Sequence, residues 1–322
     1  MNNYLRACAA LILATVFQAC GAADAAGWKP TQPIRIVVPF SAGGGSDVVA
    51  RLVSQSLGNR LGQTVIVENK PGASGAIASD LVYNAAPDGY TLLLGTADTQ
   101  AMNPHVNKVR FDSLKFVPVG GLAKVPYVLV GRADLPASNL PELLALAKRQ
   151  SLSYGSSGLG TAADVQMRMF GEVAKIDNLL HVPYQGVAPA FQGLVAGQVD
   201  LAAVPVVLAA QYRDKLKFFG LPSMERNSAI PDVPTLAEQG YRVDADSWNC
   251  LLAPPGTPAA IADAIGSQLA AVLAEPAVQK RLHEVGMTAF PGSRTEFAAF
   301  YRSEYEKWGD AIRKANIGAT AQ

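Results

Sequence analysis

The chain has 322 residues, of which 49% are hydrophobic and 16% are charged, and its formal net charge is +1 at pH 7. This composition fits one large or two medium α/β domains with buried cores, and it excludes a disordered chain. A near-neutral charge without any long run of lysine or arginine also argues against nucleic-acid binding, which needs a basic surface.

The first residues predict an export signal. Arg6 precedes an apolar run over residues 7–19 that is too short to cross a bilayer, and small residues follow at 21–26, where a signal peptidase would cleave. We therefore predict a signal peptide over residues 1–26 and a periplasmic location. Two alternatives stay open: a buried N-terminal helix, and a lipoprotein acylated at Cys20, although residues 16–19 match a lipobox poorly.

Short apolar runs then alternate with segments of helical periodicity. Strands are predicted at residues 34–38, 64–67 and 90–94, and helices at 48–57 and 77–83. The run at 34–38 is continuous and β-branched, which is typical of a strand buried on both faces. Strand–helix–strand repetition of this kind implies a parallel sheet with right-handed crossovers.

A second set of elements follows. Strands are predicted at residues 127–130, 152–154, 201–204 and 217–221, and helices at 140–149, 162–174, 187–196, 258–273, 276–285 and 295–314. From this order we predict two α/β lobes, the first of them split. Residues 27–125 and 250–322 would form the first lobe and residues 126–249 the second. The two crossing segments, near 122–128 and 248–253, would form a hinge. We find no internal sequence repeat.

The most informative motif is a glycine-rich segment at residues 39–47, between a predicted strand and a predicted helix. It lies at the carboxyl edge of the sheet, where open α/β sheets bind ligands. Its three glycines let the backbone approach a ligand, and the amides of the helix N-terminus offer unpaired donors to an anion. Ser46 or Asp47 would cap the helix. A tight glycine turn without a ligand remains the alternative.

A similar segment at residues 154–161 joins a strand to a helix in the second lobe. Its glycines and hydroxyl groups also suit the binding of an oxyanion, although an ordinary loop would have the same composition. Two such loops, one in each lobe, predict an anion held between two helix N-termini.

Motifs for catalysis, cofactors or metals are absent from the sequence. It contains no P-loop, no dinucleotide-binding fingerprint and no GxSxG nucleophile elbow. The three histidines are His105, His181 and His283. None has a carboxylate or a second histidine at metal-ligand spacing, so each is predicted to be a surface or loop residue. With Cys8 and Cys20 in the predicted signal, Cys250 alone can form neither an internal disulfide nor a cysteine metal site. We therefore predict no enzymatic activity, no metal and no cofactor.

From Trp28 almost to the end, blocks of the sequence match one family. These blocks are residues 36–47, 68–75, 86–92, 103–104, 154–161, 182–190, 197–200 and 251–258. In them the chain resembles the Bug-type extracytoplasmic solute-binding proteins of tripartite tricarboxylate transporters. The resemblance is specific because so many blocks occur in the same order.

The resemblance implies a periplasmic binding protein of type II, with a two-lobed Venus-flytrap fold, that catalyses nothing. Such a protein captures a small organic carboxylate, which could be aromatic or a dicarboxylate, through backbone groups and ordered waters. We expect a monomer that presents this ligand to the integral membrane permease subunits of a tripartite tricarboxylate-type transporter. A periplasmic sensor accessory that feeds a two-component system is the alternative.

Carried over by position, the resemblance assigns ligand-binding residues to four segments. They are Phe40, Ser41, Ala42, Gly43, Gly44 and Ser46 with Asp47 in support; Thr96, Asp98 and Thr99; Ser156, Ser157, Gly158, Thr161 and Asp164; and Tyr184, Gln185 and Gly186. Apart from these roles, Phe40, Tyr154, Tyr184 and Trp248 could line an apolar wall of the site or belong to the core.

The chain departs from the family pattern at two positions. Asp164 stands where a histidine is common, and Gln185 where a lysine is often found. Asp98 adds a further carboxylate in a loop expected to face the cleft. Because more acidic and fewer basic groups disfavour a highly charged tricarboxylate, we predict one bound carboxylate and a distal end that is neutral, hydrogen-bond donating or cationic. Alternatively, Asp98 and Asp164 are solvated or act as caps.

Overall fold

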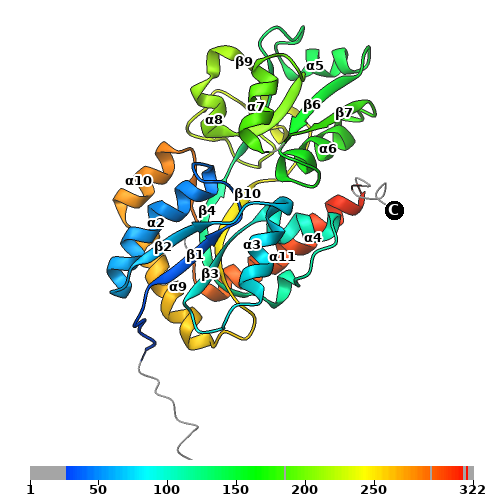
Figure 1. Cartoon of the computed structure of the whole chain (residues 1–322). Coiled ribbons are helices and arrows are strands. Elements are labelled where there is room, and N and C mark those ends of the chain that lie inside the picture. Colours follow the sequence, from blue (N-terminus) through cyan, green and yellow to red (C-terminus); the bar gives the residue numbers. More distant parts are fainter. Residues whose placement is uncertain (1–26, 185, 291, 315–316, 318–322) are drawn as a thin grey trace, which may run out of the picture.

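Two β-sheets, one in each lobe, organise the chain (Figure 1). The computed structural model describes residues 27–184, 186–290, 292–314 and 317. The predicted signal peptide, Cys20 and Gln185 lie outside the described residues. The lower lobe in Figure 1 contains a six-stranded sheet in the order β11-β4-β10-β3-β1-β2, and the upper lobe a five-stranded sheet in the order β7-β6-β8-β5-β9.

The first lobe contains both ends of the described chain. Its strands are β1 (Ile34–Val38), β2 (Val65–Asn69), β3 (Thr91–Thr96), β4 (Val117–Val125), β10 (Ser247–Ala253) and β11 (Thr288–Ala289). Its helices are α2 (Gly45–Leu61), α3 (Ala76–Tyr83), α4 (Asn103–Val106), α9 (Ala259–Leu273), α10 (Pro276–Glu284) and α11 (Arg294–Lys314), with short helical turns η1 (Ala73–Gly75), η2 (Ala97–Met102) and η3 (Ser113–Lys115). As predicted, β1 pairs in parallel with β2 and β3, whereas β10 runs antiparallel to β3 and β4.

The second lobe repeats this plan on a smaller scale. Its strands are β5 (Tyr127–Arg132), β6 (Leu152–Ser156), β7 (Leu179–Pro183), β8 (Leu201–Pro205) and β9 (Leu216–Gly220). Its helices are α5 (Leu140–Ala147), α6 (Ala162–Ala174), α7 (Val187–Val195) and α8 (Val206–Gln211), with turns η4 (Arg213–Lys215) and η5 (Ala237–Gln239). Strand β6 pairs in parallel with β7 and β8, and β5 pairs antiparallel with β8 and β9.

The chain crosses between the lobes twice. Strand β4 of the first sheet ends at Val125, and β5 of the second sheet begins at Tyr127, after Pro126. The return leads into β10, which begins at Ser247 and lies between β3 and β4. These facts confirm the predicted α/β class with two lobes and a split first lobe.

Of the four aromatic residues that the sequence placed either in a wall of the site or in the core, two lie in the core. Trp248 and Tyr154 are each 1% exposed. The indole Nε1–H groups of Trp248 and Trp308 both donate to Oε2 of the buried Glu304, each at 2.9 Å. Glu304 therefore fastens strand β10, which carries the return crossing, to helix α11. Among the described residues no single helix could span a membrane; the bent pair α9 and α10 meets the length and composition criteria only jointly.

Glycines allow the lobes to touch at two separate places. A Cβ added to Gly160 of the second lobe would lie 2.7 Å from Cγ2 of Val106 in α4. A Cβ added to Gly286, after α10, would lie 2.7 Å from Cβ of Val207 in α8 and 2.9 Å from its backbone nitrogen. At Gly160 the contact is with the side chain of Val106, and at Gly286 it includes the backbone of Val207, so the two lobes touch at both positions.

Replacement of Gly286 by alanine is therefore expected to keep the lobes apart. The φ of Gly286 is +69°, and the added methyl group would meet backbone of the other lobe, which cannot yield as a flexible side chain can. Small-angle scattering should give Gly286→Ala a larger radius of gyration than the wild type. Gly62→Ala is the matched control, because Gly62 has a φ of +70° and its Cβ would meet nothing within 4 Å in the described structure. Identical scattering of the two variants would contradict a close contact between the lobes at Gly286.

Candidate functional site

The carboxyl edges of the two sheets face each other. In the first sheet β1 and β3 are parallel, with Val37 opposite Leu93, so the loops that follow them leave from one edge. In the second sheet β6 and β7 are parallel, with Ser156 opposite Pro183, so their following loops also share an edge. Oδ1 of Asp98, after β3, accepts a hydrogen bond at 2.6 Å from the backbone N–H of Ala162, after β6. This bond joins two of the four predicted segments across the two lobes, and the first glycine loop follows β1 at the same sheet edge as the turn that carries Asp98.

The first glycine loop is stabilised by hydrogen bonds to Asp47, which is 3% exposed. Its Oδ2 accepts hydrogen bonds from the backbone N–H of Gly43 and from Nε of Arg51, both at 2.9 Å. Its Oδ1 accepts from Nδ2 of Asn69, at the end of β2, at 2.9 Å. Asn69 also donates to the carbonyl of Phe40 at 3.0 Å, so both ends of the loop are fixed.

Helix α2 does not begin as we predicted. Its N-cap is Gly44, and Ser46 and Asp47 lie inside the first turn, where Asp47 bonds back to the loop. The segment from Ser41 to Gly45 is exposed, and Phe40 is half-buried. Three of these exposed residues are glycines, so backbone groups make up much of the exposed surface of the loop.

The second glycine loop is held by Asp164 in the same way. Asp164 is fully buried, and its Oδ2 accepts from the backbone N–H of Gly160 at 2.8 Å. Its Oδ1 accepts from Nε of Arg168 at 2.8 Å and from the Tyr154 hydroxyl at 2.7 Å. Asp164 therefore neither faces the cleft nor contacts solvent, so it cannot disfavour a charged ligand as we expected from the sequence.

The two lobes thus share one loop-bracing unit, Gly-x3-Asp-x3-Arg. It comprises Gly43, Asp47 and Arg51 in the first lobe and Gly160, Asp164 and Arg168 in the second. Both glycines have a left-handed φ, +82° and +70°, which directs their N–H groups back to the aspartate. Our statement that the sequence has no internal repeat was wrong at this scale. The equal spacing of these residues in the two lobes was the signal that could have revealed Arg51 and Arg168.

The electrostatics of the first unit follow from its hydrogen bonds. Burial raises the pKa of Asp47, but the bonds from Arg51, Gly43 and Asn69 outweigh this effect and hold that pKa below its ordinary value. Asp47 in turn raises the pKa of Arg51. The carboxylate of Asp47 therefore remains ionised at neutral pH, and its charge is paired with Arg51 of the same lobe.

Thr96 and Thr99 present Asp98 to the other lobe. The Thr99 N–H donates to Oγ1 of Thr96 at 3.2 Å, and the Thr96 N–H donates to Oγ1 of Thr99 at 3.1 Å. Both threonines are buried, so their hydroxyl groups shape the turn η2 instead of contacting a ligand. Burial raises the pKa of Asp98, against the lowering effect of the Ala162 amide.

His181 is not the isolated residue that we predicted. It lies in β7, its Nε2 is 2.6 Å from Oγ of Ser156, and its ring stacks on Tyr154 with centroids 4.9 Å apart. Its Nδ1 is 3.7 Å from Oδ1 of Asp164, which exceeds hydrogen-bonding distance. Burial lowers the pKa of His181, so the ring is neutral at neutral pH.

This Ser–His–Asp grouping has the composition of a catalytic triad without its geometry. Ser156 is 1% exposed, and its hydroxyl donates to the carbonyl of Gly158 at 2.9 Å, so it is not presented to a substrate. Thr161 also donates to the Gly158 carbonyl, at 2.8 Å. The grouping therefore braces the second glycine loop.

In the fourth predicted segment, residues 184–186, the side chain of Tyr184 contacts residues of its own lobe. The hydroxyl of Tyr184 donates to Oε1 of Gln198 at 3.4 Å, and its ring lies against Gly193 and Gly155 within its own lobe. Gly186, with a φ of +125°, is the N-cap of α7. The first turn of α7 therefore lies beside the loop that follows β6.

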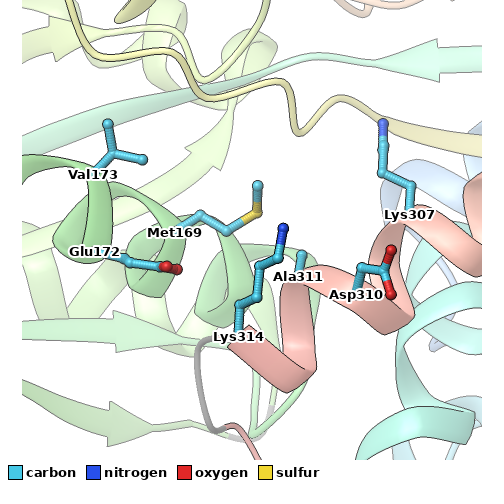
Figure 2. A pocket seen from close by; sticks show the side chains of 7 residues that line it. All are labelled: Met169, Glu172, Val173, Lys307, Asp310, Ala311 and Lys314. Atoms are coloured by element: carbon cyan, nitrogen blue, oxygen red, sulfur yellow. The ribbon is translucent and has the colours of Figure 1, made fainter.

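Two cavities are relevant to this interface. One of about 10 Å³ lies at the second glycine loop and is lined by Gly155, Ser156, Ser157, Ala163, Val187, Ala190, Ala202, Ala203 and Val204. This volume suffices for about one water molecule. Another of about 370 Å³ lies between α6 and α11, away from the loops, and Figure 2 shows Met169 and Lys314 reaching into it from the two lobes. Within the described chain no cluster of histidine, cysteine and acidic residues could hold a metal ion.

Two α/β lobes joined by two crossings, with a glycine loop after a parallel strand in each, are the architecture of two-lobed solute-binding proteins. The sequence profile described as the tripartite tricarboxylate transporter family receptor, TctC, matches residues 49–317. The chain belongs to this family, which confirms the resemblance to Bug-type solute-binding proteins.

Similar solved structures include the following three. The periplasmic binding protein BugD is 34% identical, with a TM-score of 0.80 over 89% of this chain and 99% of its own. MatC from Rhodopseudomonas palustris with bound malate is 31% identical, with a TM-score of 0.80 over 88% and 99%. Rpa4515 from R. palustris with adipate is 29% identical, with a TM-score of 0.83 over 89% and 98%.

Proposed function

We propose that the chain is exported to the periplasm, captures a small organic carboxylate between its lobes, and delivers it to the membrane permease of a tripartite tricarboxylate-type transporter. The proposal rests on one observation above all, the pair of glycine loops braced by Asp47 and Asp164 at facing sheet edges. Each brace holds a loop so that backbone N–H groups and a helix N-terminus are available to an anion.

The ligands of two relatives support a carboxylate. MatC binds malate and Rpa4515 binds adipate, and both share the fold of this chain over nearly its whole described length. Phe40, Ser41, Ala42, Gly43, Gly44 and Ser46 would contribute from the first loop. Ser157, Gly158 and Gly186 would contribute from the second lobe, whereas Asp47, Thr96, Thr99, Ser156, Thr161, Asp164 and Tyr184 would hold the loops in position.

The same geometry supports binding without catalysis. The candidate nucleophile Ser156 is buried and committed to Gly158, and His181 stacks on Tyr154 inside the lobe. The cavity of about 10 Å³ at the second glycine loop is lined by residues of the second lobe alone and is far smaller than the roughly 300 Å³ of a ligand pocket, so a ligand would need space between the lobes. We therefore expect the ligand to enter while the lobes are apart, and closure to exclude water around it.

The decisive experiment compares free acids with their methyl esters. Because oriented amides and helix dipoles bind negative charge, malate, adipate and benzoate are expected to include at least one acid that raises the melting temperature of the mature protein. The dimethyl or methyl ester of that acid should give no shift at the same concentration. Equal stabilisation by acid and ester would contradict an anion site.

A further inference from the structure

A carboxylate of the first lobe already lies at the first turn of α6 in the second. Oδ1 of Asp98 accepts from the N–H of Ala162, the first residue of α6, at 2.6 Å. The N-cap residue Thr161 makes no capping bond, because its hydroxyl donates to the carbonyl of Gly158 at 2.8 Å. The unpaired amide at this helix end is thus satisfied from the other lobe and not from its own loop.

Asp98 is held in this position by the interior of the first lobe. It lies between the mutually bonded Thr96 and Thr99. The next residue, Gln100, is fully buried, donates to Oγ of Ser79 at 2.9 Å and accepts from the Tyr301 hydroxyl at 3.2 Å. The turn that carries Asp98 is therefore anchored to α3 and α11, and its carboxylate is a fixed part of the interface.

The surrounding loops offer no cation to balance a further negative charge. None of residues 40–46, 96–99, 156–161 and 184–186 is lysine or arginine. Arg51 and Arg168 are paired with Asp47 and Asp164 beneath the loops. A second ligand carboxylate near α6 would therefore meet the charge of Asp98 and compete with it for the Ala162 amide.

We propose that Asp98 determines ligand specificity by occupying the carboxylate position on the second lobe, so that the protein selects organic acids with a single carboxylate and rejects dicarboxylates. This inference rests on the proposed function. The ligand's one carboxylate is bound by the other glycine loop, and its distal end is uncharged or donates a hydrogen bond toward Asp98. The substrate class thus excludes diacids such as the malate and adipate bound by the relatives.

The test uses pairs of ligands that differ in one charge: adipate with its monoamide adipamate, and succinate with succinamate. Isothermal titration calorimetry of the wild type should show the monoamide of at least one pair binding at least tenfold more tightly than the diacid. Asp98→Gly frees the Ala162 amide and removes the charge, so it is expected to bind the diacid more tightly than the wild type does. The preference for the monoamide should fall at least tenfold.

Two further variants make the result specific. Asp98→Asn keeps an oxygen that can accept from Ala162 and removes only the charge, so its preference for the monoamide should lie between those of the wild type and Asp98→Gly. Asp177→Asn removes an exposed carboxylate of the second lobe and should leave the preference unchanged.

The inference is overturned if the wild type binds a diacid as tightly as its monoamide, or if Asp98→Gly leaves the ratio unchanged. Both outcomes would leave the proposed carboxylate binding intact. If no acid and no monoamide binds to the wild type, the proposed function itself fails, and the specificity of Asp98 fails with it.

Discussion

Replacement of Asp164 by asparagine is expected to lower the free energy of unfolding by about 3 kcal/mol, because a buried charged acceptor is lost while its donors remain. Both oxygens of Asp164 accept hydrogen bonds, from Gly160, Arg168 and the Tyr154 hydroxyl. An amide nitrogen at either position would face a donor with another donor. Urea denaturation of the purified protein measures the change.

Two matched variants control this experiment. Asp47→Asn removes the equivalent carboxylate from the first lobe, so it should also destabilise the protein. Asp177→Asn changes an exposed aspartate beyond the end of α6 and should stay within about 0.5 kcal/mol of the wild type. If Asp164→Asn were as stable as Asp177→Asn, the bracing role of Asp164 would be refuted.

Replacement of Glu304 by leucine is expected to cost about 4 kcal/mol of unfolding free energy, because a buried acceptor of two indole N–H groups is removed. Trp248 and Trp308 each donate to Oε2 of Glu304 at 2.9 Å, and Lys307 pairs with Oε1 at 2.6 Å. Leucine leaves all three donors without this acceptor. Urea denaturation followed by tryptophan fluorescence reports both the loss of stability and any exposure of the indoles.

Glu304→Gln separates the hydrogen bonds from the charge. Its side-chain oxygen can still accept from both indoles, so its cost should be about 1–2 kcal/mol and clearly below that of leucine. Glu306→Leu places the same substitution at an exposed position of the same helix and should have little effect. Equal destabilisation by Glu304→Gln and Glu304→Leu would mean that the pair with Lys307, and not the indole bonds, is what matters.

Each element that the sequence predicted well has one strong signal in its own residues. Strand β1 is a continuous β-branched run, and its predicted bounds, 34–38, are those observed. Helix α6, predicted at 162–174, follows a glycine loop and has a clear apolar face. Strands β4 and β7 were missed because their signals are mixed: β4 contains Pro118 and two adjacent glycines with shifts of register, and β7 is a half-exposed edge strand.

The sequence predicted where the candidate loops lie in the fold, but it did not predict which hydrogen bonds their side chains make. Strand ends and glycines indicate where backbone amides gather, and the sheet register places those loops at one edge. What a carboxylate contacts depends on side-chain direction, which the sequence did not reveal. Asp164 and Asp98 both looked like cleft-facing acids, yet the first is buried beneath its loop and the second reaches the other lobe.

Each Gly-x3-Asp-x3-Arg brace is contained within a single lobe, and this has a consequence for the order of events during uptake. Bending the hinge breaks none of these bonds, so each half of the receptor keeps its shape while the other swings away. An incoming solute then meets a preorganised half-site, and little conformational entropy is lost when it docks. In the proposed transport role, release to a permease would correspondingly require only that the two lobes separate, and neither loop would have to unfold.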